Sequence, residues 1–198
     1  MFPIIIQEEV FHVGQRPGTK GSTEKGRSSF EGNALSVSTH PDAWRRIARP
    51  LPGALWRLEG PGRFIDYHAF SDQQLSSLLQ SRRDLVRPKT HYFALVGEDE
   101  DGAVWEGPFT KREEASAEVD RAEDVVPSVL WLPTPKLLSS SGAIRGEDAT
   151  TDALLVIAGE QGLDGVWWDD DLDIYAGSAP RGGLLRSRLR EWDIEEAA

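Results

Sequence analysis

The stretch TDALLVIAGEQGLDGVWWDDD, residues 151–171, contains a helix pattern and a strand pattern in direct succession. Apolar side chains recur through its first half at helical spacing, and Gly162 follows as a typical helix end. The short apolar run 166–168 then predicts a buried strand, which leads into a row of aspartates. A helix, a strand and an acidic loop so close together indicate a domain that mixes both kinds of secondary structure.

Strands and short helices alternate irregularly along the rest of the chain. Apolar patterns predict strands over residues 10–13, 34–38 and 129–132, and the last of these is a continuous apolar run that we expect to be buried. The absence of a regular strand–helix–strand rhythm favours an α+β fold over a doubly wound one. A length of 198 residues fits a single domain over residues 1–198.

Glycine and proline mark the predicted connections. A hairpin is expected over residues 55–67 around Gly60-Pro61-Gly62, and a second hairpin over residues 92–105 with an acidic tip. The sequence Pro180-Arg181-Gly182-Gly183 predicts a turn. Residues 15–32 are polar and include four glycines, so we expect a long mobile loop there, of the kind that often carries function.

Charge and composition exclude several classes of protein. With 22 Lys and Arg against 33 Asp and Glu, the formal charge is −11, which disfavours broad binding to nucleic-acid phosphates. The chain has no cysteine, and its four histidines lack the spacing of a helical metal motif. The apolar run at residues 4–6 is too short for a signal peptide or a membrane span, so we expect a soluble, cytoplasmic protein without a membrane partner.

The first segment with candidate site residues is residues 11–14, at the end of a predicted strand. His12 has apolar neighbours on both sides, and two interpretations remain open for it. It either hydrogen-bonds into a neighbouring loop or binds a sugar hydroxyl. In the second case Gly14 lets the following backbone approach a ligand closely.

The second segment is a short strand that runs into a helix. Alternation places Ser36 and Ser38 on one face of the strand, and Trp44 lies on the following helix. The two serines either belong to a solvated strand face or line a cleft at the junction of strand and helix. The sequence leaves both interpretations open.

The third segment, residues 165–173, has two adjacent tryptophans followed by four carboxylates within five residues. Trp168 offers a flat ring for stacking, and Arg181 follows a few residues later. The carboxylates form either a solvated acidic loop or a divalent-metal site, although their spacing does not match the EF-hand pattern.

In this order the three segments resemble an ADP-ribosyltransferase of the His–Tyr/Ser–acid type, similar to the compact bacterial kind that includes rifampicin-modifying enzymes and toxins. In that family a first-strand His contacts a ribose of NAD, a second strand runs into a helix, and a late acid completes the site. The resemblance implies a compact mixed or antiparallel split sheet with short flanking helices. It also implies a glycosyltransferase that uses NAD as substrate, modifies an unidentified acceptor and can have a neutralising partner protein.

The resemblance also assigns a role to each candidate residue. One of Asp169, Asp170 and Asp173 would be the catalytic acid, which stabilises the positive charge that develops on the ribose. No metal is needed for this reaction. The residues expected to bind NAD are His12, Gly14, Ser36, Ser38, Trp44, Trp168 and Arg181. The chain departs from the family in having only aspartates at the late acid position, which disfavours arginine as the acceptor.

Two other functions fit the same sequence. The charge of −11 and the acidic tip at residues 98–101 fit a non-enzymatic inhibitor or binding protein with a basic partner. The aspartates of residues 169–173, together with His12 or His40, fit a metal-dependent hydrolase.

Overall fold

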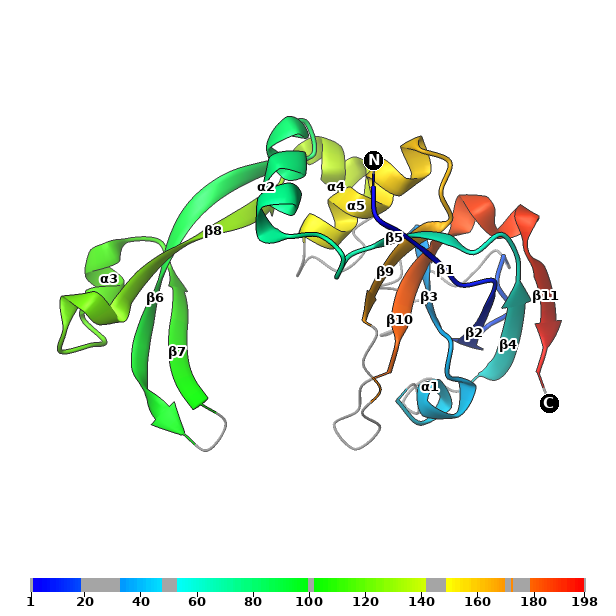
Figure 1. Cartoon of the computed structure of the whole chain (residues 1–198), viewed down its shortest axis with the longest axis horizontal. Helices are drawn as coiled ribbons and strands as arrows, with labels where there is room; N and C mark the ends of the chain where they lie inside the picture. The colour runs from blue at the N-terminus through cyan, green and yellow to red at the C-terminus, as the bar shows by residue number, and fades with distance from the viewer. Residues whose placement is uncertain are drawn as a thin grey trace.

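The computed structural model describes residues 2–18, 33–47, 53–99, 102–141, 149–169, 172 and 179–197. These residues form two β-sheets that are joined through helices (Figure 1). The larger sheet has the order β1-β5-β9-β10-β3-β2-β4-β11 and the smaller one β7-β6-β8. This mixture of strands and helices confirms the α+β character that the sequence predicts.

The bounds of the elements are as follows. The strands of the larger sheet are β1 (Ile4–Ile6), β2 (Glu9–Gly14), β3 (Ala34–Ser38), β4 (Ala54–Glu59), β5 (Arg63–Asp66), β9 (Gly165–Asp169), β10 (Arg181–Leu185) and β11 (Asp193–Glu196). Those of the smaller sheet are β6 (Val86–Asp99), β7 (Gly102–Phe109) and β8 (Val125–Pro133). The helices are α1 (Pro41–Ile47), α2 (Asp72–Ser81), α3 (Arg112–Ser116), α4 (Pro135–Ser141) and α5 (Ala149–Glu160), with 3₁₀ turns η2 (Ala122–Asp124) and η3 (Arg186–Glu191).

The larger sheet curls because two segments pair along their whole lengths around a shared bend. β1 pairs with β5 and β2 pairs with β4, both antiparallel, so residues 4–14 run beside residues 54–66. At the bend, the Gln7 N–H donates to the Gly62 carbonyl and the Gly60 N–H donates to the Glu8 carbonyl. We call this eight-stranded unit the curled sheet.

The predicted hairpin over residues 55–67 is wrong. β4 and β5 cover these residues, but β4 pairs with β2 and β11, whereas β5 pairs with β1 and β9. Gly62 has a φ of +66°, and a Cβ on it would lie 2.4 Å from the carbonyl carbon of Gln7. The connection therefore packs against the N-terminal segment and does not close a hairpin of its own.

The predicted turn at residues 180–183 is also wrong, because β10 already begins at Arg181. A Cβ on Gly182 would lie 2.4 Å from the ring of Trp167, and one on Gly183 would lie 2.8 Å from the ring of Trp168. The two glycines belong to a strand that the tryptophans of β9 cover. They indicate close packing here, not a change of chain direction.

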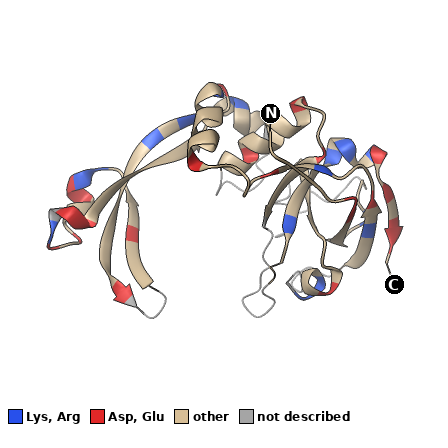
Figure 2. Ribbon diagram, in the orientation of Figure 1, with Lys and Arg blue, Asp and Glu red and all other residues tan. Residues whose placement is uncertain are grey.

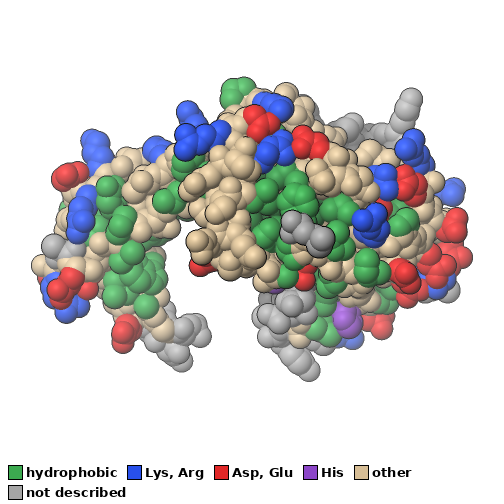
Figure 3. Space-filling view, turned by 45° about the horizontal axis from the view of Figure 1, so that its top comes forward, with side chains coloured by type: hydrophobic (Ala, Val, Ile, Leu, Met, Phe, Trp, Pro, Cys, Tyr) green, Lys and Arg blue, Asp and Glu red, His purple; other side chains and the backbone are tan. Residues whose placement is uncertain are grey.

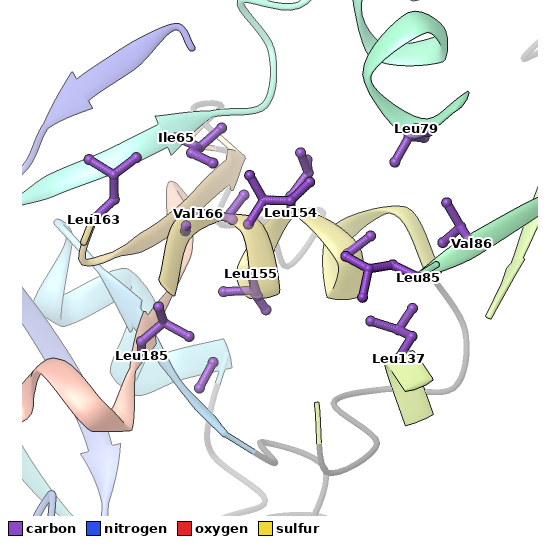
Figure 4. Close-up of a cluster of buried hydrophobic side chains, with 14 residues drawn as sticks. Ile65, Leu79, Leu85, Val86, Leu137, Leu154, Leu155, Leu163, Val166 and Leu185 are labelled. Carbon is purple, nitrogen blue, oxygen red and sulfur yellow. The ribbon is translucent and has the colours of Figure 1, made fainter. Parts of the chain in front are cut away.

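The main hydrophobic core surrounds α5, which confirms the helix and strand predicted from residues 151–171 (Figure 4). Leu154 is fully buried and Leu155 is 1 % exposed, and they pack near Val166 of β9. Burying one leucine side chain contributes about 1.5–3 kcal/mol. The same core contains Leu85 and Val86, where the smaller sheet begins.

The smaller sheet and α3 together form a projection that we call the arm, residues 86–133 (Figure 1). The predicted hairpin over residues 92–105 is confirmed by the pairing of β6 with β7. The expectation that residues 129–132 form a buried strand is wrong in one respect, because β8 projects with the arm and Val129 is 53 % exposed. An apolar run is buried only where another layer covers it.

Among the described residues, no helix combines the length and the apolar character needed to cross a membrane. The larger part of the predicted mobile loop, residues 19–32, lies outside the described residues.

Candidate functional site

The curled sheet opens between β2 and β3. These two neighbouring strands pair at a single position, Phe11 with Ser38. β2 remains paired with β4 from Glu9 to Gly14, and β3 remains paired with β10 along its whole length. Each strand therefore keeps its outer partner while the two inner strands separate.

His12 spans this opening. Its Nδ1 lies 2.9 Å from the carbonyl oxygen of Ser36. Because a carbonyl oxygen only accepts hydrogen bonds, Nδ1 carries the proton and donates it, and Nε2 of the neutral ring is an acceptor. Nε2 faces the backbone of Gly14, where an added Cβ would lie 3.1 Å from it at a φ of +143°. Glycine is thus required at position 14.

Burial keeps the His12 imidazole neutral. The residue is 5 % exposed, and this burial lowers its pKa from 6.5 to about 4. The hydrogen bond to Ser36 opposes the shift, while the positive charge of Arg186 adds to it. At neutral pH the ring is therefore a hydrogen-bond acceptor held at a fixed position in the opening.

The sequence analysis missed one residue of the neighbouring strand that lies beside this histidine. Trp56 of β4 lies opposite His12 in the register, and its indole N–H donates to the Gly14 carbonyl at 3.0 Å. The guanidinium of Arg16 lies 5.9 Å from the centre of the Trp56 ring, which is a cation–π distance. The sequence predicts that Trp56 lies in a strand. It does not indicate that this strand pairs with β2, so it does not place Trp56 beside His12.

Three further candidates occupy one row of the sheet. Ser38 of β3 pairs with Arg181 of β10, and Arg181 pairs with Asp169 of β9. Paired residues share a face, so Ser36, Ser38 and Arg181 lie on the same side of the sheet. By alternation His12 starts from the opposite side and reaches the β3 backbone through the opening. The structure thus brings His12 to the Ser36 carbonyl and not to the serine hydroxyls.

The Ser38 and Trp44 side chains are both buried beside this row. The Ser38 hydroxyl accepts a hydrogen bond of 3.1 Å from the backbone N–H of His40, just before α1 begins. Trp44 of α1 packs against Val13 and Leu55, and its indole N–H has no acceptor among the described residues.

Trp168 has a packing role in the structure. It is half-buried against the core around α5 and its ring covers Gly183. Its backbone carbonyl also accepts a hydrogen bond from the His68 ring. Of the predicted catalytic acids, Asp170 and Asp173 lie outside the residues that the structure describes. For Asp169 the structure describes only the backbone, as the last residue of β9.

Asp164 is a deeply buried carboxylate with a structural role. Asp164 is 1 % exposed and accepts from the Arg63 N–H at 2.8 Å and from the Trp192 indole at 3.2 Å. Arg188 lies 3.6 Å from it. No group of three or more His, Asp and Glu side chains suited to hold a metal ion occurs within the described ranges.

A hollow of about 360 Å³ lies at the other end of β3 and β10. Asn33, Leu155, Leu185 and Arg186 are among its lining residues. The same Arg186 carries the positive charge that helps to lower the pKa of His12.

Comparison of the chain with protein-family models, with curated proteins and with solved structures finds no match in any of the three.

Proposed function

We propose that this protein is an ADP-ribosyltransferase or NAD glycohydrolase, which cleaves the bond between nicotinamide and ribose in NAD. The observation that carries this proposal is the opening between β2 and β3, where the neutral His12 ring is fixed with an acceptor nitrogen beside Gly14. The three-part resemblance of the sequence supports the same assignment.

In this proposal His12 binds a ribose hydroxyl. Nε2 accepts the hydroxyl proton, while the hydrogen bond from Nδ1 to Ser36 fixes the orientation of the ring. Gly14 has no side chain to keep the sugar away from Nε2. Because the pKa of His12 is lowered to about 4, the ring stays an acceptor across the physiological pH range.

The remaining candidates then have separate roles. Arg181 binds the pyrophosphate, because a guanidinium matches phosphate oxygens. The face that carries Ser36 and Ser38 holds the carboxamide side of the substrate. A carboxylate from residues 169–173 stabilises the positive charge that develops at the ribose carbon.

The reaction itself balances without a further reagent. The bond from the nicotinamide nitrogen to the ribose carbon breaks, and its electron pair leaves with nicotinamide. An acceptor atom, or water in a glycohydrolase, forms the new bond to that carbon and loses a proton. This is glycosidic bond cleavage with a positively charged transition state.

The proposal is tested by incubating the protein with NAD and measuring released nicotinamide. Replacing Asp169, Asp170 and Asp173 singly by Asn should identify one residue whose loss lowers turnover at least about a hundredfold, as expected when a group that stabilises transition-state charge is removed. Asp193→Asn, an exposed carboxylate on β11, is the matched control and should retain activity.

A second measurement, of NAD binding, distinguishes a wrong proposal from an inactive protein preparation. NAD should raise the midpoint of thermal unfolding of the wild type and of Asp193→Asn, and His12→Ala should lower this shift. Turnover that survives all three aspartate changes contradicts the assignment of the acid. An absence of both turnover and thermal shift in the wild type contradicts the proposed function.

A further inference from the structure

Toward its free end, one face of the arm is apolar and uncovered. Phe93 of β6 pairs with Val126 of β8, and two residues further along β6 Leu95 pairs with Trp105 of β7. Paired side chains share a face, and residues two apart in a strand share it as well. We call these four residues, Phe93, Leu95, Trp105 and Val126, the open face.

The opposite face of the arm is covered by α3. Ala94 and Val125 pair with each other and pack against Ala115 of α3, and all three are almost fully buried. None of the four open-face residues belongs to a core cluster of the described residues. Trp105 is 46 % exposed and Val126 is 43 % exposed. Figure 3 shows hydrophobic side chains at the surface of the arm. Exposed apolar patches of this kind mark interaction sites.

The arm is also the main source of the negative charge of the chain. Residues 86–133 contain eleven acidic and five basic residues, a net charge of −6 out of −11 for the whole chain. Figure 2 shows acidic residues at the free end of the arm and along α3. The register places Glu98 on the same side as Trp105, because Glu98 pairs with Ala103 two residues before it.

A hollow of about 590 Å³ adjoins the same end of the arm. Its lining includes the carboxylates of Glu98, Glu118, Asp120 and Asp124, together with Arg121, which pairs with Asp124 at 3.0 Å. Four carboxylates against one arginine leave this hollow negative. It has the charge and the room for a lysine or arginine side chain.

We propose that the open face of the arm binds a basic protein that presents an apolar side chain between lysines or arginines. The apolar group would pack on Trp105 and Val126, and the cations would face Glu98 and the acidic hollow. Tryptophan is enriched at the energetic centres of protein interfaces, and complementary charge at the rim directs association. Nucleic acid, an anionic membrane and a second copy of this chain all carry negative charge that the arm would repel.

The proposal is tested with two labelled peptides of equal length and charge, one alternating Lys with Leu and the other alternating Lys with Ser. Fluorescence anisotropy with the full chain should show that the Lys–Leu peptide binds at least about tenfold more tightly. Trp105→Ala should weaken the binding of this peptide by about tenfold or more. Val126→Lys should abolish it, because the change adds a repelling charge to the open face.

The matched control is Val129→Lys. Val129 lies on the same strand as Val126 and is 53 % exposed, but it pairs with Thr90 and so lies on the other face. This variant should bind the Lys–Leu peptide nearly as the wild type does. Circular dichroism and thermal unfolding of all three variants establish that the arm remains folded.

Four results would overturn the proposal. They are no binding of the Lys–Leu peptide, equal binding of both peptides, equal loss in Val126→Lys and Val129→Lys, and wild-type binding by Trp105→Ala. Trp105-dependent binding of anionic vesicles or duplex RNA would contradict the proposal and identify a membrane or a nucleic acid as the partner. Self-association that Trp105→Ala abolishes would identify a second copy of this chain as the partner. These readouts do not depend on NAD turnover, so they are separate from the test of the proposed function.

Discussion

The curled sheet and the arm follow the same rules of strand pairing but differ in what covers them. β3 of the curled sheet is buried on both faces, and only Ser36 is half-exposed among its five residues. β8 of the arm is just as apolar over residues 129–132, yet only Val125 at its end is fully buried. The comparison teaches that apolar sequence supplies the strand, whereas a second layer of structure determines its burial.

The largest effect that would test this comparison comes from adding a methyl group at a glycine in each sheet. A Cβ on Gly165 would lie 1.8 Å from the carbonyl oxygen of Gly183, whereas one on Gly97 of β6 would meet nothing within 4 Å. We expect Gly165→Ala to cost about 3 kcal/mol or more, or to prevent folding, because two backbones are in contact there. Gly97→Ala should stay within about 0.5 kcal/mol. Urea unfolding measures both, and similar values would contradict the difference in packing.

A second pair of changes compares a leucine in each region. Leu154 of α5 is fully buried, whereas Leu95 on the open face is half-buried. Leu154→Ala should lower the free energy of unfolding by about 2–5 kcal/mol through lost burial and the cavity that remains. Leu95→Ala should cost less than about 1 kcal/mol. An arm that loses as much stability as the core would indicate that its open face is covered.

Acidification should destabilise the curled sheet through His12. The pKa of His12 is about 4 in the folded protein, whereas the ordinary value of 6.5 applies to the unfolded chain. The unfolded chain therefore binds the proton first as the pH falls. Stability is therefore retained above pH 6.5 and lost between pH 6.5 and 4, by about 1–3 kcal/mol. Urea unfolding at several pH values measures this slope. His12→Gln should have a smaller slope over the same range, and an unchanged slope would assign the effect to other groups.

The smallest effect is expected where the arm begins. Arg82 and Lys136 both contact Asp84 and hold the pKa of its carboxyl well below its usual range. Asp84 is 39 % exposed, so solvent screens these pairs and Asp84→Asn should cost less than about 1 kcal/mol. The loss should shrink in high salt. A stabilising contribution of this carboxylate is present above its unfolded pKa and disappears as the pH falls below it. A cost that does not change with salt would contradict this electrostatic account.

Local patterns predicted much of the secondary structure. The helix and strand of residues 151–169 form as expected. Such features depend on neighbours in sequence, which is why a single chain reveals them. The prediction of a turn at Gly182 and Gly183 was wrong because glycine occurs both in turns and in strands that a large side chain covers closely. Only the tryptophans packed on these glycines identify a strand here.

The candidate site was predictable only in part. The sequence singled out His12, Gly14 and Ser36, and the structure places them in contact. Trp56 and Arg186 were missed, because their proximity to His12 arises from pairing and charge across distant segments. Whether an aspartate of residues 169–173 completes the site stays a prediction, which the variants above test.

The sequence by itself determined the mixed α+β character, the strong negative charge and the positions of most strands, since these depend on composition and on spacing between near neighbours. Only the tertiary structure decided that β4 and β5 lie apart, that β2 and β3 separate around His12, and that the arm leaves one apolar face uncovered. The physical reason is that strand pairing and burial are contacts between distant segments. Alternation along one strand indicates which side chains share a face, but it does not identify what lies against that face.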